Sequence, residues 1–238
     1  MSTTFDLQGA LNLDGAPVAI GFLPEPPEGI PPWTGGPVAA GCAFWRLARR
    51  GQAFYTVPSD HHHCAVGAHV HGIALPDERA SELAETLEAM AEAGYVAPDE
   101  VSSIPTVWEA PAFIAYAPAT DSPFPPDVVV VAGTPAQVML LHEAALRAGV
   151  APMTVPAMGR PGCAVLPLAM QTGEAAISLG CAGNRISTAL AQEELYSAIP
   201  GQSWPAVVGT LPSILAANKT MDGLYRRRVL LVEGSTST

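Results

Sequence analysis

The feature that most constrains the fold is a pattern that occurs twice along the chain. Residues 41–67 and residues 162–183 each open with Gly-Cys-Ala, continue through an apolar helical stretch and a short strand, and close on a second cysteine followed by glycine. All the cysteines of the chain fall at matching positions of this pattern: Cys42, Cys64, Cys163 and Cys181. The pattern predicts an internal duplication, with copies over roughly 17–110 and 126–218 related by a pseudo-twofold axis.

Short apolar runs alternate with amphipathic stretches along the whole chain, which favours a layered α/β or α+β fold. We expect one domain over 1–238 with a C-terminal tail at 219–238. Strands are predicted at 17–23, 53–57, 112–117, 127–132 and 175–179, and helices at 37–50, 77–93, 134–147, 162–171, 204–218 and 221–228. Residues 60–72 have no clean period and indicate a loop or a short helical turn. An amphipathic helix is expected to follow each copy, around 83–93 and around 207–217.

Composition and charge exclude several classes of protein. The net charge is −11, and phosphate contacts need clustered Lys and Arg, so nucleic-acid binding is not expected. No apolar run approaches the ~20 residues of a membrane-spanning helix, and the N-terminus lacks the pattern of a signal peptide. We therefore expect a cytoplasmic protein with no membrane contact. The apolar run Val229–Val232 beside Arg226–Arg228 predicts that the tail packs on the domain or on a second subunit, as in a homodimer.

Four cysteines in an acidic, cytoplasmic chain are not expected to form disulfides. Cys42 and Cys163 are predicted near helix N-termini, where the helix dipole favours the thiolate that binds metal. If the copies pack about a pseudo-twofold axis, Cys42, Cys64, Cys163 and Cys181 converge on one metal site. We place an iron–sulfur cluster before zinc, because a structural zinc would add little to a chain with this much apolar core, and haem is a further alternative.

Histidines surround Cys64 and leave a second interpretation open. His61 or His71 could activate Cys64 as a nucleophile without any metal, and the catalytic candidates are therefore Cys64, His61 and His71. His62 and His63 adjoin them, whereas His142 is predicted to be a packing residue in a helix. Near the cysteines of the second copy, the candidate cofactor-binding residues are Arg160, Asn184 and Arg185, and the two arginines could balance thiolates or grip a small anionic substrate.

The same motifs resemble a bacterial and archaeal family called domain of unknown function 169, also labelled ArCR. The resemblance covers roughly 17–218 and is carried by Gly41-Cys42-Ala43, Asp60-His61 with Cys64 and Gly67, Met158-Gly159-Arg160-Pro161 with Cys163-Ala164, and Leu179-Gly180-Cys181 with Gly183-Asn184-Arg185. The family usually has an aromatic and an amide residue where this chain has His62 and His63. That departure leaves His61 and His71 as the better ligand candidates. The resemblance implies the extent of the domain and the position of the site, and it implies no reaction.

No phosphate-binding glycine loop, G-x-S-x-G elbow or H-E-x-x-H pair is present. Three hypotheses remain open. The first is a metal- or cluster-dependent enzyme that acts on a small anionic molecule. The second is a non-catalytic carrier or sensor of metal, haem or cluster, and the third is a metal-free enzyme with a Cys/His nucleophile. The sequence does not decide whether the protein is an enzyme.

Overall fold

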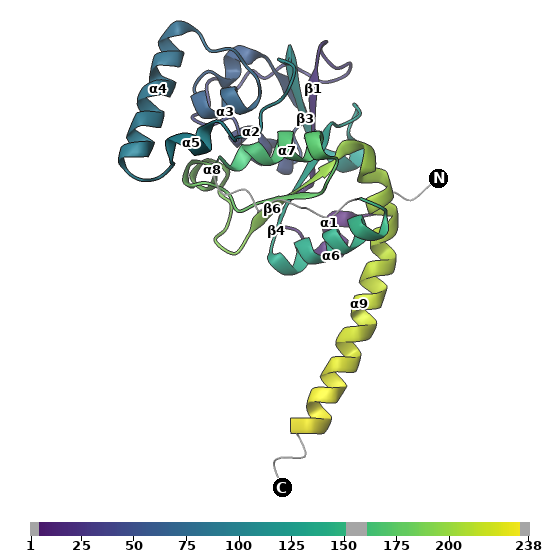
Figure 1. The fold of residues 1–238 in the computed structure, drawn as a ribbon. Coiled ribbons are helices and arrows are strands. Elements are labelled where there is room, and N and C mark those ends of the chain that lie inside the picture. Colours follow the sequence, from purple (N-terminus) through teal and green to yellow (C-terminus); the bar gives the residue numbers. More distant parts are fainter. Residues whose placement is uncertain (1–4, 151–160, 234–238) are drawn as a thin grey trace.

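A computed structural model describes residues 5–150 and 161–233 and is built on one antiparallel sheet. Its six strands run in the order β2-β3-β1-β4-β6-β5 (Figure 1). The strands are β1 (Val18–Leu23), β2 (Phe54–Thr56), β3 (Phe113–Pro118), β4 (Val128–Gly133), β5 (Ala176–Ser178) and β6 (Leu195–Pro200). The first three strands of the chain thus occupy one half of the sheet and the last three occupy the other half.

The two halves meet where β1 pairs with β4. The register there joins three residue pairs, with Ala19 opposite Val129 at the centre. On either side, β1–β3 and β4–β6 are each joined over six pairs. β4 is buried along its whole length, as expected for a central strand covered on both faces.

One face of the sheet is covered by the helices that carry the cysteine motifs. Their bounds are α2 (Ala43–Arg49), α3 (Ala65–Val70), α7 (Val165–Thr172) and α8 (Ala182–Thr188). The inward residues of these helices and of the strands form a single apolar core, in which Phe44 and Trp45 from the first half meet Val165 and Leu166 from the second. The short helices η1 (Pro58–His61) and η3 (Gly162–Ala164) lead into α3 and α7.

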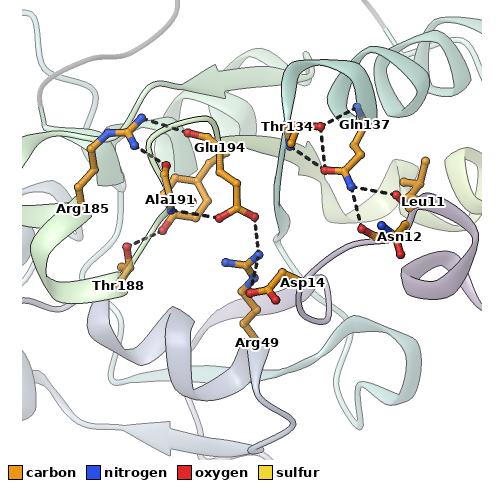
Figure 2. A network of polar contacts seen from close by, with 11 residues as sticks. Leu11, Asn12, Asp14, Arg49, Thr134, Gln137, Arg185, Thr188, Ala191 and Glu194 are labelled. Carbon is orange, nitrogen blue, oxygen red and sulfur yellow. Dashed lines mark hydrogen bonds and ion pairs between the residues drawn. The ribbon is translucent and has the colours of Figure 1, made fainter.

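The opposite face of the β4–β6 half is covered by α1 (Leu7–Leu11), α6 (Pro135–Arg147) and α9 (Trp204–Glu233). α6 begins with the predicted capping box: the N–H of Thr134 donates to Oε1 of Gln137 at 2.7 Å, and the Gln137 N–H donates to Oγ1 of Thr134 at 3.4 Å (Figure 2). The amide nitrogen of Gln137 also donates to the carbonyls of Leu11 and Asn12, which fixes the N-terminal segment against this half.

Two helical segments lie outside the packed layers. The C-terminal half of α9 extends away from the rest of the molecule (Figure 1). α4 (Asp77–Glu92) contacts α3 but buries none of its own residues, and α5 (Pro98–Val101) follows it. The remaining short helices are η2 (Ala119–Asp121) and η4 (Gly201–Ser203). Among the described residues no helix is both long and apolar enough to span a membrane.

The mixed α/β architecture agrees with the sequence, but two local expectations were wrong and one strand was missed. Residues 204–218 and 221–228 form the single helix α9, because the residues between them include no strong helix breaker. α2 starts at Ala43 rather than near 37, after a turn in which Gly36 has φ of 76°. β6 was not predicted. The helices expected around 83–93 and 207–217 are present as parts of α4 and α9, but their places in the topology differ, since α4 precedes β3 whereas α9 follows β6.

Candidate functional site

Each of the four cysteines stands at the start of a helical segment on the same face of the sheet. Cys42, Cys64 and Cys181 are the residues that precede α2, α3 and α8, and Cys163 lies in η3 just before α7. Cys181 caps its helix, because its sulfur accepts a hydrogen bond from the Asn184 N–H at 3.4 Å. None of the four forms a disulfide.

The fold brings these four thiols into mutual electrostatic range. Cys42 is affected by the charges of Cys64 and Cys181, and Cys163 is affected by Cys64, Cys42 and Cys181. Two cysteines come from each half of the sheet, so the group spans the β1–β4 contact. Across residues 5–150 and 161–233, no three His, Cys, Asp or Glu side chains are arranged to hold one metal ion as they stand.

Burial keeps the thiols of Cys42 and Cys163 protonated, which corrects one expectation from the sequence. Burial raises the pKa of Cys42 to about 12, with further increases from the neighbouring thiols and a decrease from the Asn184 side chain. Burial likewise raises the pKa of Cys163 well above the usual range. The helix dipole was expected to favour thiolate at these two positions, but loss of hydration dominates. Binding a metal there would therefore release protons.

His61 is buried and held at one ring nitrogen. Its Nε2 lies 2.8 Å from Oγ1 of Thr56, a residue at the end of β2, and the Thr56 hydroxyl lies 3.1 Å from the carbonyl oxygen of Ile114. The other ring nitrogen, Nδ1, has no hydrogen-bond partner among the described residues. Burial lowers the pKa of His61 well below its usual value, so this imidazole is neutral.

His71 lies next to His61, with 5.6 Å between the ring centroids. It is fully buried, and neither of its ring nitrogens has a hydrogen-bond partner in the described part of the chain. Burial lowers the pKa of His71 to about 4. On its other side, the ring of Phe22 meets His71 edge-on at 5.5 Å. Two neutral imidazoles therefore lie together in the interior with three nitrogens unpaired, an arrangement that is costly without a ligand or water.

The nucleophile interpretation requires a hydrogen bond between Cys64 and a histidine. The polar contacts of His61 and His71 described above include none to the Cys64 sulfur. The contact that exists joins backbones: the Cys64 N–H donates to the carbonyl of His61 at 3.0 Å. The geometry of the described residues thus places imidazole and thiol in the same region without coupling them as base and nucleophile.

The structure adds two polar residues that the sequence did not single out, Tyr116 and Tyr196, and shows a role for Asn184. Both amide atoms of buried Asn184 and the hydroxyl of Tyr116 lack a hydrogen bond of good geometry among the described residues. Asn184 is nevertheless close enough to lower the pKa of Cys42 and Tyr196. Burial raises the pKa of Tyr116 well above its usual value; Cys42 and Cys163 raise it further, whereas the nearby Thr56 side chain lowers it. These polar side chains therefore lie near the thiols. The sequence did not single out the tyrosines, because a tyrosine in a strand belongs to no recognisable motif.

Two glycines, Gly41 and Gly67, lie so close to His61 and Cys64 that a larger residue would collide with these side chains. A Cβ placed on Gly41 would lie 3.0 Å from Nδ1 of His61, and one placed on Gly67 would lie 2.8 Å from the sulfur of Cys64. Both distances are shorter than ordinary van der Waals contact. The glycines of the Gly-Cys-Ala and Cys-x-x-Gly patterns thus let the backbone approach the histidine and the thiol.

Arg185 has a structural role in the part of the chain that the structure describes. Its guanidinium donates to the carbonyls of Ala191 at 2.7 Å, Leu179 at 2.6 Å and Glu194 at 3.0 Å (Figure 2). The Glu194 carboxylate in turn forms an ion pair with Arg49 at 2.7 Å, which ties the second half to the first. Arg160 lies outside the described residues.

The remaining histidines are elsewhere. His63 and His69 are exposed, and His62 is half-buried. His142 on α6 belongs to the opposite face of the sheet, where its Nε2 lies 2.9 Å from the Ser197 hydroxyl, which agrees with a packing role.

Fold and site together define a mixed α/β domain that carries, over one face of an antiparallel sheet, one buried thiol, three half-buried thiols and two buried neutral imidazoles. The chain belongs to the family described as uncharacterised ArCR, domain of unknown function 169, whose model matches residues 6–209. The membership predicted from the sequence motifs is thereby confirmed. Comparisons with the curated proteins and with the solved structures gave no match.

Proposed function

We propose that the interior site binds an iron–sulfur cluster or another soft metal centre through Cys42, Cys64, Cys163 and Cys181. One observation carries the proposal: four thiols in mutual electrostatic range lie beside buried polar atoms that lack partners in the described chain. Buried polar groups are almost always hydrogen-bonded. Several unpaired polar atoms beside thiols, which are soft metal ligands, therefore support the binding of a further group at this site.

The unpaired donors favour a cluster over a lone zinc ion. The Tyr116 hydroxyl and the Asn184 amide nitrogen are donors close to the thiols. The bridging sulfides of a cluster accept hydrogen bonds, which also tune its potential, whereas a zinc ion with four thiolates has no acceptor besides its ligands. The lone pair on Nδ1 of His61 is a further possible ligand. Zinc and haem remain alternatives that the experiment below separates.

We also propose that the chain holds two copies of one unit. The strand order supports this, because β3 and β2 follow β1 outward in one half as β6 and β5 follow β4 in the other. The connections support it too: Cys42 and Cys163 lie between the first and second strands of their halves, and Cys64 and Cys181 lie between the second and third. In such a duplication, equivalent cysteines would meet across the β1–β4 contact.

The test is anaerobic purification followed by reconstitution with iron and sulfide, with iron, acid-labile sulfide and zinc measured per chain. We expect stoichiometric iron and sulfide with a broad absorption near ~400 nm, which each of the four Cys→Ser variants loses. His63→Gln is the matched control for His61→Gln, because the His63 side chain is exposed. Stoichiometric zinc or a sharp haem band would replace the cluster by that alternative. A protein that stays metal-free after separate loading with iron and sulfide, with zinc and with haem would overturn the proposal.

Whether the centre is catalytic, and whether the substrate is a small anion, stays a prediction. Arg185 donates the N–H groups of its guanidinium to three carbonyls, so these donors are not available to an anion. A carrier or sensor would show the same cofactor stoichiometry and no turnover.

We further propose that the protein forms a homodimer in which the projecting part of α9 packs on α4 of a second copy. Six large apolar side chains are exposed on this part of α9: Met221, Leu224, Tyr225, Val229, Leu230 and Leu231. Arg226, Arg227 and Arg228 lie among them, whereas α4 presents Glu78, Glu82, Glu85 and Glu88 around a half-exposed apolar stripe. At 1.5 Å per residue, residues 219–233 and α4 have similar lengths, about 22 and 24 Å.

A further inference from the structure

A cavity of about 400 Å³ lies beside the proposed centre, at the end of the sheet where β1 finishes and β4 begins. Its wall is formed by Phe22 at the end of β1, Asp127 just before β4, the loop with Trp108 and Glu109, and the side chains of Met170 and Gln171 on α7. Its volume is within the range of ~300–1,000 Å³ that is usual for small-molecule sites. Phe22 separates it from His71.

The polar side of this cavity carries negative charge. Asp127 and Glu109 both line it, and neither forms an ion pair with a Lys, Arg or His of the described residues. One carboxylate oxygen of Asp127 accepts the Phe22 N–H at 2.6 Å, and burial raises the pKa of this carboxyl above its usual value. A partly desolvated carboxylate with a single backbone donor is stabilised by any cation placed near it.

The apolar side of the cavity offers an aromatic face. Trp108 is 80% exposed, the most exposed of the tryptophans within the described residues, although it lies on the wall of a cavity. The loop that carries it is held in place, because Gln171 on α7 donates to the Thr106 carbonyl at 2.5 Å and the Val107 N–H donates to the Val70 carbonyl at 2.9 Å. A positioned indole next to two carboxylates is a typical environment for an organic cation.

We propose that this cavity binds a small organic cation, an ammonium group attached to an apolar body, with the charge between Asp127, Glu109 and the Trp108 ring and the body against Phe22 and Met170. The net charge of −11 favours entry of such a ligand and opposes an anion. The ligand of this cavity therefore differs from the anionic molecule that Arg160 and Arg185 led us to expect. The proposal does not depend on whether the cysteines hold a metal.

The experiment titrates the full chain with three probes of similar size, 2-phenylethylammonium, 2-phenylethanol and 3-phenylpropionate, by calorimetry and by tryptophan fluorescence. We expect saturable binding of the ammonium compound, at least tenfold weaker binding of the alcohol and none of the carboxylate. Asp127→Asn should weaken ammonium binding about tenfold while leaving the alcohol unchanged, since Asn still accepts the Phe22 N–H.

Two further variants, one inside the cavity and one outside it, test whether binding takes place there. Trp108→Ala should abolish the fluorescence change and weaken binding, whereas Glu92→Gln on α4 removes a carboxylate outside the cavity and should change nothing. If Asp127→Asn does not fold, Glu109→Gln serves in its place, because the Glu109 carboxylate forms no hydrogen bond within the described residues. Binding of 3-phenylpropionate at least as tight as that of the ammonium compound would overturn the proposal, and so would a failure of the ammonium compound to saturate by about 10 mM.

Discussion

Oγ1 of Thr56 lies 2.8 Å from Nε2 of His61, and the same hydroxyl donates its proton to the carbonyl of Ile114 at 3.1 Å. A hydroxyl has one proton, so we assign the Thr56 oxygen as the acceptor towards His61, which puts the hydrogen on Nε2. Nδ1 of His61 is then an unprotonated nitrogen that faces Gly41 in the interior. One threonine thus sets which imidazole nitrogen is free to bind a ligand.

This assignment predicts the NMR spectrum of the metal-free protein. Long-range proton–nitrogen correlations should show His61 as the neutral Nε2-protonated tautomer at pH 7. Thr56→Val should remove that preference and weaken metal loading several-fold, while Thr56→Ser should preserve both. A Nδ1-protonated His61 in the wild-type chain would contradict the assignment.

His71 predicts a loss of stability in mild acid. Its pKa is about 4 in the folded chain and about 6.5 when exposed, so the unfolded state binds more protons between these values. The free energy of unfolding should therefore fall as pH drops below about 6.5, by about 2 kcal/mol at pH 5 from this residue alone. Urea unfolding of the metal-free protein at pH 7 and pH 5 measures the difference.

The matched variant is His71→Leu, which removes two unpaired polar nitrogens and the titration with them. It should reduce the pH 7-to-5 difference by about 2 kcal/mol, whereas His63→Gln should leave it unchanged. An undiminished difference in His71→Leu would assign the acid sensitivity to other groups.

The raised pKa of Cys42 predicts that this thiol is alkylated slowly. A thiol with a pKa of about 12 holds almost no thiolate at pH 8, and thiolate is the form that alkylating reagents attack. Iodoacetamide should therefore modify Cys42 of the folded, metal-free chain at least a hundredfold more slowly than after unfolding in urea, as measured by mass spectrometry of the peptides. Rapid modification of Cys42 in the folded chain would show that the thiol is neither buried nor protonated.

The proposed dimer predicts a charge-exchange result. Changing Arg226, Arg227 and Arg228 to Glu should turn the dimer into monomers in light scattering, and so should changing Glu82, Glu85 and Glu88 to Arg. Mixing the two variants should restore both α9–α4 contacts, because each contact of the mixed dimer then pairs arginines with glutamates, and should yield a heterodimer. A wild-type chain that is monomeric at micromolar concentration, or a triple Glu variant that stays dimeric, would contradict the arrangement.

Local patterns were sufficient for much of the fold. The capping box at Thr134 and the continuous apolar run of β4 each have a local cause, and both were found. β6 was missed because Leu195–Pro200 is a short run that mixes polar and apolar residues and ends in proline, and its strand character depends on pairing with β4 and β5. The continuity of residues 204–218 with 221–228 was missed because no positive signal indicates it; the residues between them merely lack a strong helix breaker.

Some features of the site could likewise be predicted from the sequence, and others could not. Cysteines and histidines are visible in any sequence, and the cysteine pattern that occurs twice predicted that Cys42 and Cys163 lie in one region. Their protonation was misjudged because burial is a property of the packed chain, and it outweighs the helix dipole. Tyr116 lies in a strand far in the sequence from the cysteines it affects, so no local pattern could have identified it. Thr56 is only five residues from His61, but its contact with that ring depends on the fold of β2 and η1 and leaves no sequence motif.

The contact between β1 and β4 is half as long as the contacts on either side of it, three residue pairs against six. A sheet whose two halves meet over so short a ladder is suited to being divided there. Two polypeptides separated in the 119–127 connection should be able to recombine, guided by the packing of Leu7 and Leu11 on the second half and by the Arg49–Glu194 ion pair. Complementation of this kind would make the middle of the sheet an assembly surface, with the thiols enclosed only once both pieces have joined.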